Sequence, residues 1–170
     1  IELGNLIAKN KLSLVYGGGN IGLMGALASS AQQSKCNILG VIPEHLLKKE
    51  IGKPNLKNLI VTSNMHERNK LMYDRSDSFV VLPGGVGTLD EFFEILTWAQ
   101  LDLHTKPIIL LNIDKFWNPL IDLLKHQIES GFMEHNINKL FKLAFECIYP
   151  YCYFCLIIVL RLTCCIWRGG

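Results

Sequence analysis

The sequence predicts an α/β protein built on an open parallel sheet with helices on both faces. The first observation is a set of short apolar runs without polar alternation, which is typical of strands buried on both faces of a parallel sheet. The second is that segments with apolar residues at helical spacing separate these runs, with connections long enough for crossovers. Glycine-rich turns follow two of the runs. Because ligands of such sheets bind at the carboxyl ends of the strands, these turns indicate where a site lies.

The totals fit one domain of modest charge. A chain of 170 residues is long enough for a sizeable core. Its net charge is +2 and its lysines are spread thinly, which argues against nucleic acid as a partner. Cys36 is the one cysteine before residue 147, so a reducing cytoplasm is expected rather than a disulfide framework. No signal peptide is visible, and the start at Ile1 rather than Met suggests the cut end of a longer protein.

The first half of the chain reads as helix, strand, glycine turn, helix and strand. The expected segments are a helix at 1–11, a strand at 12–16, the turn at 17–22, a helix with the small-residue stretch 25–28, and a strand at 38–42. The turn has the spacing Gly-x-Gly-x-x-Gly, and Glu44 follows the second strand. This order is the dinucleotide-binding fingerprint of Rossmann-like folds. Turns of this kind also bind other phosphates, and some only pack tightly, so the motif leaves the ligand open.

The next segments bring an arginine onto a partly apolar helix face. Residues 44–58 are polar and predict a loop or a short helix, and residues 59–62 predict a third strand. In the following helix, residues 65–73, Arg68 shares a face with Met65 and Met72. Such an arginine either lies along the surface with its head in water or reaches an anion at the sheet edge.

The stretch 79–91 carries the strongest prediction of a site. An apolar strand, residues 79–82, leads into a glycine-rich turn and then a helix. Unpaired N–H groups at the start of that helix, together with its dipole, form a ready anion site. Thr88 is expected to be the N-cap or a hydroxyl donor to a phosphate. Glu91 either completes a capping box with Thr88 or has a chemical task, since a carboxylate near this position repels an anion. The expected core positions of the helix are Phe92, Leu96, Ala99 and Leu103.

The end of the chain differs in character from the rest. A strand at 107–111 and a helix from about 117 to Gly131 complete a domain expected to span residues 1–138. Residues 139–170 form an atypical Cys-rich apolar tail without helical or strand periodicity, such as a shifted reading frame or a mispredicted gene end produces. Its apolar run 147–160 is too short for a bilayer span, so a membrane anchor is not expected. Cys152 and Cys155 have zinc-knuckle spacing, but without a second pair no metal site is expected.

Three motifs read together resemble one known family. They are Met-His-Glu-Arg at 65–68, Pro-Gly-Gly-Val-Gly-Thr-Leu-Asp-Glu at 83–91 and Leu-Thr-Trp-Ala-Gln at 96–100. In these three motifs the chain resembles the Lonely Guy family. Its members are cytokinin riboside 5′-monophosphate phosphoribohydrolases, which were long labelled lysine decarboxylases. The Tyr-Gly-Gly-Gly turn at 16–19 also looks like the family. The resemblance covers roughly residues 2–133.

The resemblance implies hydrolysis of the N-glycosidic bond of a purine nucleoside 5′-monophosphate, without a cofactor or metal, in a cytoplasmic homodimer. Arg68 and Glu91 match the two residues regarded as essential. A carboxylate such as Glu91 suits the task because the transition state carries positive charge on the ribose. Arg68 then pairs with the phosphate or steadies the carboxylate. The implied substrate and phosphate contacts are Gly18, Gly19, Glu50, Asn69, Gly84, Gly85, Val86, Gly87, Thr88 and Thr97.

The chain departs from the family in three places. Asn69 stands where the family usually has Lys, so a positive charge is missing unless Lys70 supplies it. The family's first strand lies before the point where this chain begins, which predicts an exposed edge inside the sheet. The usual C-terminal helix is replaced by the Cys-rich tail. His66, although next to Arg68, is interpreted as structural.

Two other functions compete with the hydrolase. The first is a nucleotide- or molybdenum-cofactor-binding protein of the same superfamily without catalysis, which the change at Asn69 favours and the pair Arg68 and Glu91 disfavours. The second is a nicotinamide-dependent oxidoreductase, based on residues 17–22 and Glu44. No Tyr-Lys or His-acid set of such an enzyme follows in the sequence.

Overall fold

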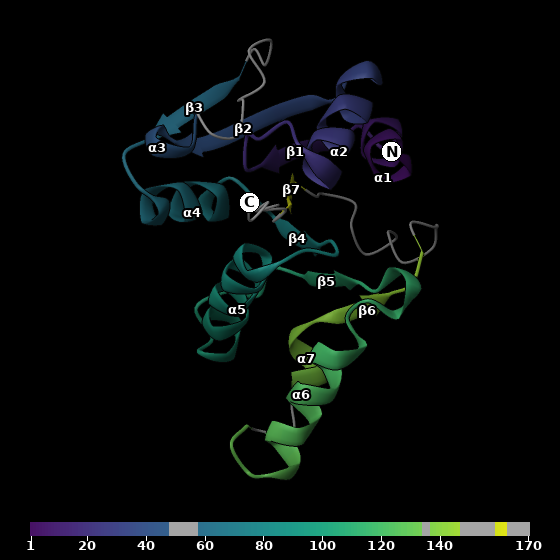
Figure 1. Ribbon diagram of the computed structural model, residues 1–170, viewed down its shortest axis with the longest axis vertical. Helices are drawn as coiled ribbons and strands as arrows, with labels where there is room; N and C mark the ends of the chain where they lie inside the picture. Colours follow the sequence, from purple (N-terminus) through teal and green to yellow (C-terminus); the bar gives the residue numbers. More distant parts are fainter. Residues whose placement is uncertain (48–57, 134–136, 147–158, 163–170) are drawn as a thin grey trace, which may run out of the picture.

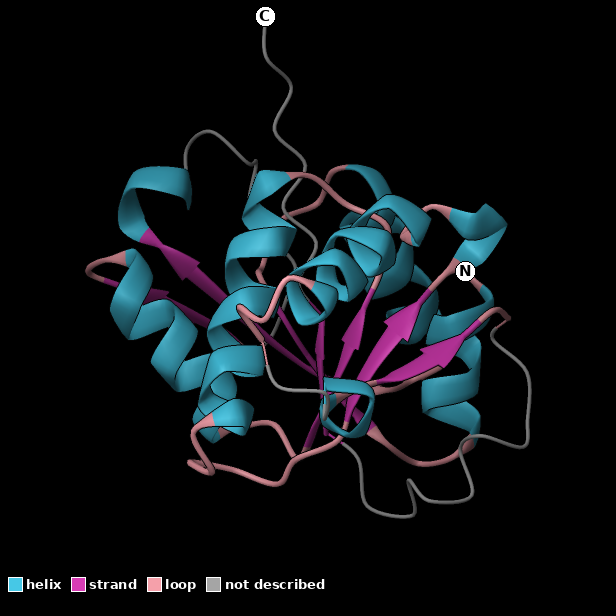
Figure 2. Cartoon of the chain, turned by 90° about the horizontal axis from the view of Figure 1, so that it is seen from below, coloured by secondary structure: helices cyan, strands magenta, loops and turns pink. Residues whose placement is uncertain are grey.

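The computed structural model describes residues 1–47, 58–133, 137–146 and 159–162. They form one parallel sheet with helices on both faces (Figures 1 and 2), as the sequence predicts. The strand order is β3-β2-β1-β7-β4-β5-β6. The strands are β1 (Ser13–Tyr16), β2 (Asn37–Pro43), β3 (Leu59–Thr62), β4 (Ser78–Val81), β5 (Ile108–Leu111), β6 (Lys142–Ala144) and β7 (Val159–Leu162). The helices are α1 (Glu2–Lys9), α2 (Gly22–Gln33), α3 (Glu44–Leu47), α4 (Met65–Asp74), α5 (Val86–Gln100), η1 (Ile113–Lys115), α6 (Asn118–Glu129) and α7 (Ile137–Leu140).

Alternation along the buried strands divides the core between the two faces of the sheet. In β1, Leu14 and Tyr16 pack with α1 and α2, whereas Val15 packs with Met72 of α4. In β4, Val80 joins the first of these clusters, and its neighbour Phe79 packs with α5 and α6. Because successive side chains of a strand point to opposite faces, an uninterrupted apolar run is what a two-sided core requires.

The centre of the sheet is filled from the end of the chain. β7 pairs in parallel with β1 on one side and with β4 on the other. The expected exposed edge at β1 is therefore wrong, because the hydrogen-bonding groups of β1 meet those of β7. Residues 139–170 also contribute β6, which pairs with β5 at the end of the sheet although this part of the sequence shows no strand periodicity. The predictions for Cys152, Cys155 and most of the apolar run 147–160 concern residues outside the described ranges.

Helix α5 is shorter at its C-terminal end than its apolar spacing predicts. The helix ends at Gln100, and Asp102 then adopts a positive φ of 56°. Phe92, Leu96 and Ala99 are buried as expected, but Leu103 is 65% exposed and is not a core residue. The left-handed turn at Asp102 ends the helical register, so position 103 no longer follows the buried stripe.

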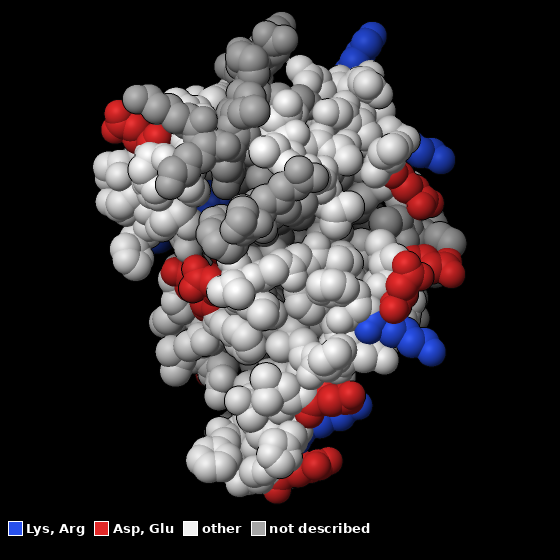
Figure 3. All heavy atoms as spheres, in the orientation of Figure 1, with Lys and Arg blue, Asp and Glu red and all other residues white. Residues whose placement is uncertain are grey.

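The described surface carries scattered charge. On the face shown in Figure 3, acidic and basic side chains are interspersed and gather in no broad patch of one sign. Among the described helices, none combines the length and the apolar character that crossing a membrane requires.

Candidate active site at the carboxyl ends of the strands

Helix α4 begins with a side-chain cap that fixes where its arginine lies. Asn64 is the N-cap, and its Oδ1 accepts a hydrogen bond of 2.9 Å from the N–H of Glu67. The Glu67 carboxylate accepts in return from the N–H and the hydroxyl of Ser63, at 2.8 Å each. These reciprocal bonds satisfy N–H groups at the helix start. The next residue, Arg68, is thereby placed one turn into the helix, above the end of β2.

Arg68 and Glu91 form a buried ion pair between α4 and α5. The distance from Arg68 Nη1 to Glu91 Oε1 is 2.6 Å, and the two side chains are 2% and 1% exposed. Arg68 Nε also donates to the carbonyl of Val41, in the second half of β2, at 3.3 Å. The other carboxylate oxygen of Glu91, Oε2, is buried and has no hydrogen-bond partner in the part of the chain that the structure describes. Burying two charges is costly, so such a pair with a spare acceptor points to function more than to stability.

Gly17 makes room for the arginine head. It follows β1 directly and is buried, and a Cβ at this position would overlap Arg68 Nη2. The glycine is therefore required by the close approach of a side chain from α4. This contact joins the first glycine turn to the Arg68–Glu91 pair, as their common position after parallel strands predicts.

The start of α5 differs from the expected capping arrangement. The N-cap is Gly85, which has no side chain to offer, and the helix begins at Val86. Thr88 lies inside the first turn, with its N–H donating to the Gly85 carbonyl at 3.0 Å. The prediction that Thr88 is the N-cap is therefore wrong, and so is the capping box with Glu91. Glu91 turns to Arg68 instead.

The turn before α5 exposes backbone where a ligand can approach. At Gly84 a Cβ would collide with the Thr88 side chain, so packing requires this glycine. At Gly85 a Cβ would meet nothing within 4 Å, so packing does not explain it. Val86 is 82% exposed, and the first turn contains no acidic residue. The first amides of a helix have no partner within it, and together with the dipole they favour an anion.

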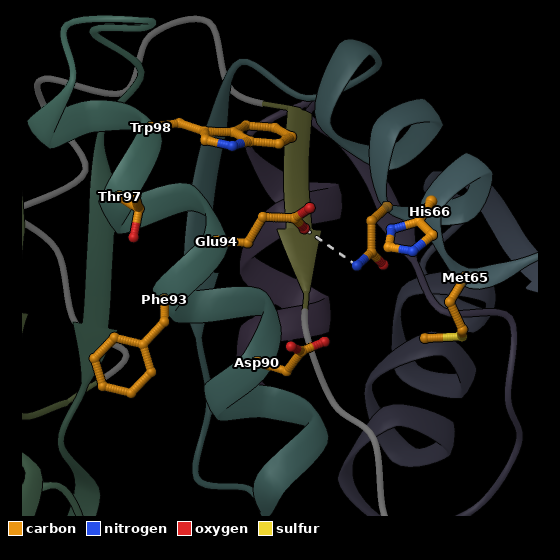
Figure 4. A pocket seen from close by; sticks show the side chains of 8 residues that line it. Met65, His66, Asp90, Phe93, Glu94, Thr97 and Trp98 are labelled. Atoms are coloured by element: carbon orange, nitrogen blue, oxygen red, sulfur yellow. Dashed lines mark hydrogen bonds between the residues drawn. The ribbon is translucent and has the colours of Figure 1, made fainter.

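A cleft of about 510 Å³ lies between α4 and α5 (Figure 4); Asn69 and Asp90, the chain neighbours of Arg68 and Glu91, line it, whereas the buried pair itself does not. Asn69, next to Arg68, lies on its α4 side and is 5% exposed. Its Nδ2 donates to Glu94 Oε2 at 3.1 Å, and Glu94 extends toward α4 in Figure 4. Asn69 Oδ1 is buried and has no partner among the described residues. The residues that line the cleft are Met65, His66, Asn69, Asp90, Phe93, Glu94, Thr97 and Trp98.

The remaining predicted contacts are distributed around this centre. Gly18 is buried with a positive φ of 76°, and Gly19 is buried beside it. Thr97 is exposed and lines the cleft. Glu50 lies outside the described residues. Lys70 pairs with Asp74 at 2.6 Å on the exposed face of α4, so it does not take the place of the family's lysine. The binding roles of these residues, and of Gly84, Gly85, Val86, Gly87 and Thr88, stay predictions.

Apart from Thr97, sequence reasoning missed the part of the cleft that α5 contributes. Asp90, Glu94 and Trp98 follow one another at intervals of four residues, which places them on one side of the helix. That spacing was visible in the sequence, but nothing showed that α4 faces this side. His66 is exposed and also lines the cleft, and its structural interpretation stays a prediction. Across the described ranges, no cluster of three or more His, Cys, Asp or Glu side chains is placed to hold a metal ion.

Fold and site together define a Rossmann-like α/β protein with a buried arginine–glutamate pair at the carboxyl ends of its strands. A model of the family described as possible lysine decarboxylase matches residues 24–147. Because this match covers more than half of the 170 residues, the chain belongs to that family.

Curated relatives carry the name that the Lonely Guy motifs predict, so the resemblance is confirmed. The cytokinin riboside 5′-monophosphate phosphoribohydrolase of Rhodococcoides fascians is 46% identical over 132 residues, which are 77% of this chain and 67% of that protein. A probable enzyme of this name from Oryza sativa subsp. japonica is 40% identical over 144 residues, 85% of this chain. One from Arabidopsis thaliana is 39% identical over 140 residues, 82% of this chain. The chain spans 59% and 65% of the length of these two plant proteins.

Solved structures of similar fold come from molybdenum cofactor proteins. The molybdenum cofactor binding protein from Rippkaea orientalis has a TM-score of 0.58 and 27% identity, covering 86% of this chain and 77% of that one. The molybdenum cofactor carrier protein from Chlamydomonas reinhardtii has a TM-score of 0.59, the same coverages and 23% identity, which shows the fold alone.

Proposed function

We propose that the protein hydrolyses the N-glycosidic bond of a purine nucleoside 5′-monophosphate to the free base and ribose 5-phosphate. The observation that carries this proposal is the buried pair of Arg68 and Glu91, with the second carboxylate oxygen lacking a partner among the described residues. The names of the relatives from Rhodococcoides fascians and the two plants support it. Glu91 of this pair belongs to α5, whose start has no side-chain cap. The carboxylate and the proposed phosphate site are therefore on the same helix.

The reaction follows from this arrangement. Water attacks the anomeric carbon while the bond to the purine nitrogen breaks, and the base leaves with the bonding electrons and takes up a proton. Positive charge builds on the ribose as the bond lengthens. Glu91 Oε2 stabilises that charge and accepts a proton from the attacking water, giving ribose 5-phosphate. Arg68 holds the carboxylate in place through Oε1, at 2.6 Å.

The phosphate is placed by the start of α5. The amides of Val86 and Gly87 point out of the helix end, and Gly85 leaves the approach to them open. Glu91 follows about one and a half turns later, a rise of about 8 Å from Val86 along the axis. A 5′-phosphate at the helix end therefore leaves the ribose beside Glu91, where the proposed chemistry needs it.

Glu91→Gln tests the proposal directly. The amide keeps the size of the side chain and an acceptor for Arg68, but it cannot stabilise a cation or take a proton. We expect release of adenine from AMP to fall by at least about 100-fold, the lower bound for loss of a general base. Asp74→Asn removes the same charge from the exposed face of α4 and should leave the rate unchanged. Hydrolysis by Glu91→Gln at the parent rate would refute the assigned role.

A carrier of nucleotide or molybdenum cofactor is the second candidate. The similarity to the molybdenum cofactor binding protein from Rippkaea orientalis favours it, because the two chains share 27% sequence identity as well as the fold. Asn69, where the Lonely Guy family usually has lysine, is a further point in its favour. Incubation with AMP separates the two candidates. Release of adenine supports the hydrolase, and tight binding of AMP without release supports the carrier.

We further propose that the protein acts in the cytoplasm as a homodimer. On α5, Val86 and Phe93 leave apolar surface exposed on the side that also presents Asp90 and Thr97. A second copy covering this surface would enclose the cleft. Sedimentation analysis of the wild type and of Phe93→Asp tests this, with dimer and monomer as the respective expected results.

A further inference from the structure

The buried amide of Asn69 has a fixed orientation. The oxygen and the nitrogen of an asparagine amide are similar in size, so their positions are assigned from their hydrogen-bond partners. A carboxylate only accepts hydrogen bonds, so its partner must be the nitrogen. Because Asn69 Nδ2 lies 3.1 Å from Glu94 Oε2, the nitrogen must face Glu94 and the oxygen must face the other way. Glu94 therefore decides that the remaining polar atom of Asn69 is an acceptor.

That acceptor has no donor in the described structure. Asn69 is 5% exposed, and Oδ1 is buried without a hydrogen bond within the described ranges. A buried unpaired oxygen is destabilising, so it needs an explanation such as a ligand. Asn69 lines the cleft together with Glu94 and with His66, whose exposed side chain is free to change rotamer. The ligand implied here supplies an N–H.

The walls of the cleft suit a flat ring. Met65 from α4 and Trp98 from α5 line it beside Asn69. Trp98 is held edge-on against Tyr73, with ring centroids 4.8 Å apart. Glu94 lies about 12 Å along the α5 axis from Val86, by the rise per residue. A nucleotide whose phosphate lies at the start of α5 and whose ribose lies at Glu91 extends its base in this direction.

We propose that Asn69, oriented by Glu94, determines base specificity by accepting a hydrogen bond from the 6-amino group of adenine. The inference rests on the proposed hydrolase function and adds the base that the site selects. A 6-oxo purine presents an acceptor at the same place, which would face Asn69 Oδ1 without a hydrogen. AMP is therefore the preferred substrate over IMP.

Glu94→Gln tests the orientation. A glutamine at 94 can donate to Asn69 Oδ1, which lets the Asn69 amide turn and present its nitrogen to the cleft. We expect the ratio of kcat/KM for AMP to that for IMP to fall about 10-fold or more, the range for one buried hydrogen bond. Asn69→Leu, with no polar atom, should lower kcat/KM for AMP more than that for IMP, so that the ratio falls in this variant too. Asp74→Asn on the exposed face of α4 is the matched charge control and should keep the parent ratio.

Binding of the free bases gives a readout that does not need turnover. By calorimetry, the parent protein should bind adenine more tightly than hypoxanthine, and Glu94→Gln should reduce or reverse that preference. If the protein has no hydrolase activity but prefers adenine, and this preference depends on Glu94, the proposed function is refuted and this inference is supported. An AMP-to-IMP ratio unchanged in both variants, with circular dichroism showing that they fold, would overturn the inference and indicate that ordered water satisfies Oδ1.

Discussion

Gly17 lies against the guanidinium of Arg68, so closely that a Cβ on residue 17 would overlap Arg68 Nη2. The glycine belongs to the turn after β1, and the arginine comes from α4, which packs on β2 and β3. Their contact means that the first glycine turn is shaped by the ion pair as well as by backbone conformation. The turn and the pair are consequently expected to fail together when either is changed.

Gly17→Ala should displace Arg68 from Glu91. We expect a loss of about 1–3 kcal/mol in the free energy of unfolding, as for overpacking at a rigid site, together with loss of AMP hydrolysis. Urea unfolding and the adenine-release assay measure the two effects. Gly85→Ala is the matched control, because a Cβ there meets no atom within 4 Å. It should cost less than about 1 kcal/mol and still lower activity. Equal stability losses in the two variants would contradict this account.

The buried ion pair should be dispensable for folding but not for activity. Arg68→Met leaves the Glu91 carboxylate buried without its partner, and we expect a loss of about 3–5 kcal/mol in urea unfolding. In Arg68→Met/Glu91→Leu both charges are gone, so much of that stability should return, while adenine release stays absent. A double variant less stable than Arg68→Met would show that the pair stabilises the fold.

Tyr16 should make the protein sensitive to alkali. Its hydroxyl is buried without a partner in the described structure, and burial raises the pKa of Tyr16 to about 12 from its ordinary value near 10.0. Because the folded state holds the proton more tightly, the associated stability is complete below pH 10 and is lost as the pH rises toward 12. Tyr16→Phe should reduce this loss between pH 10 and 11.5, and at pH 7 it should leave the free energy of unfolding unchanged or raised. A parallel pH dependence in both proteins would contradict the prediction.

Strand β7 should be needed to hold the sheet together. Leu160 pairs with Leu14 of β1 and with Ser78 of β4. Leu160→Pro removes a donor from the middle of the sheet, where proline is not tolerated, so we expect a loss of about 3 kcal/mol or more. Leu160→Val keeps the strand and should lose less than half of that amount. Thermal unfolding compares the three proteins, and equal stability of Leu160→Pro and the parent would exclude β7 from the sheet.

The two helices of the site show which local features the sequence reveals. Strand and helix positions were predictable because buried strands and amphipathic helices impose periodicity on the sequence, as in residues 59–62 and β3. The start of α5 was not predicted correctly, since Thr88 and Glu91 have the spacing of a capping box. That spacing is equally compatible with a helix that begins three residues earlier, at Val86 instead of Leu89. Only the pairing of Glu91 with Arg68 distinguishes the two.

The sequence by itself determined the fold class, the family and the two charged residues of the candidate site, because periodicity and short motifs are local properties of the chain. The tertiary structure alone decided that β7 fills the sheet between β1 and β4, and that Asn69 faces Glu94 across a cleft. β7 lies 80 or more residues along the chain from the strands with which it pairs, and Asn69 lies 25 residues from Glu94. Distant segments meet through packing and hydrogen-bond geometry, which no short window of sequence contains.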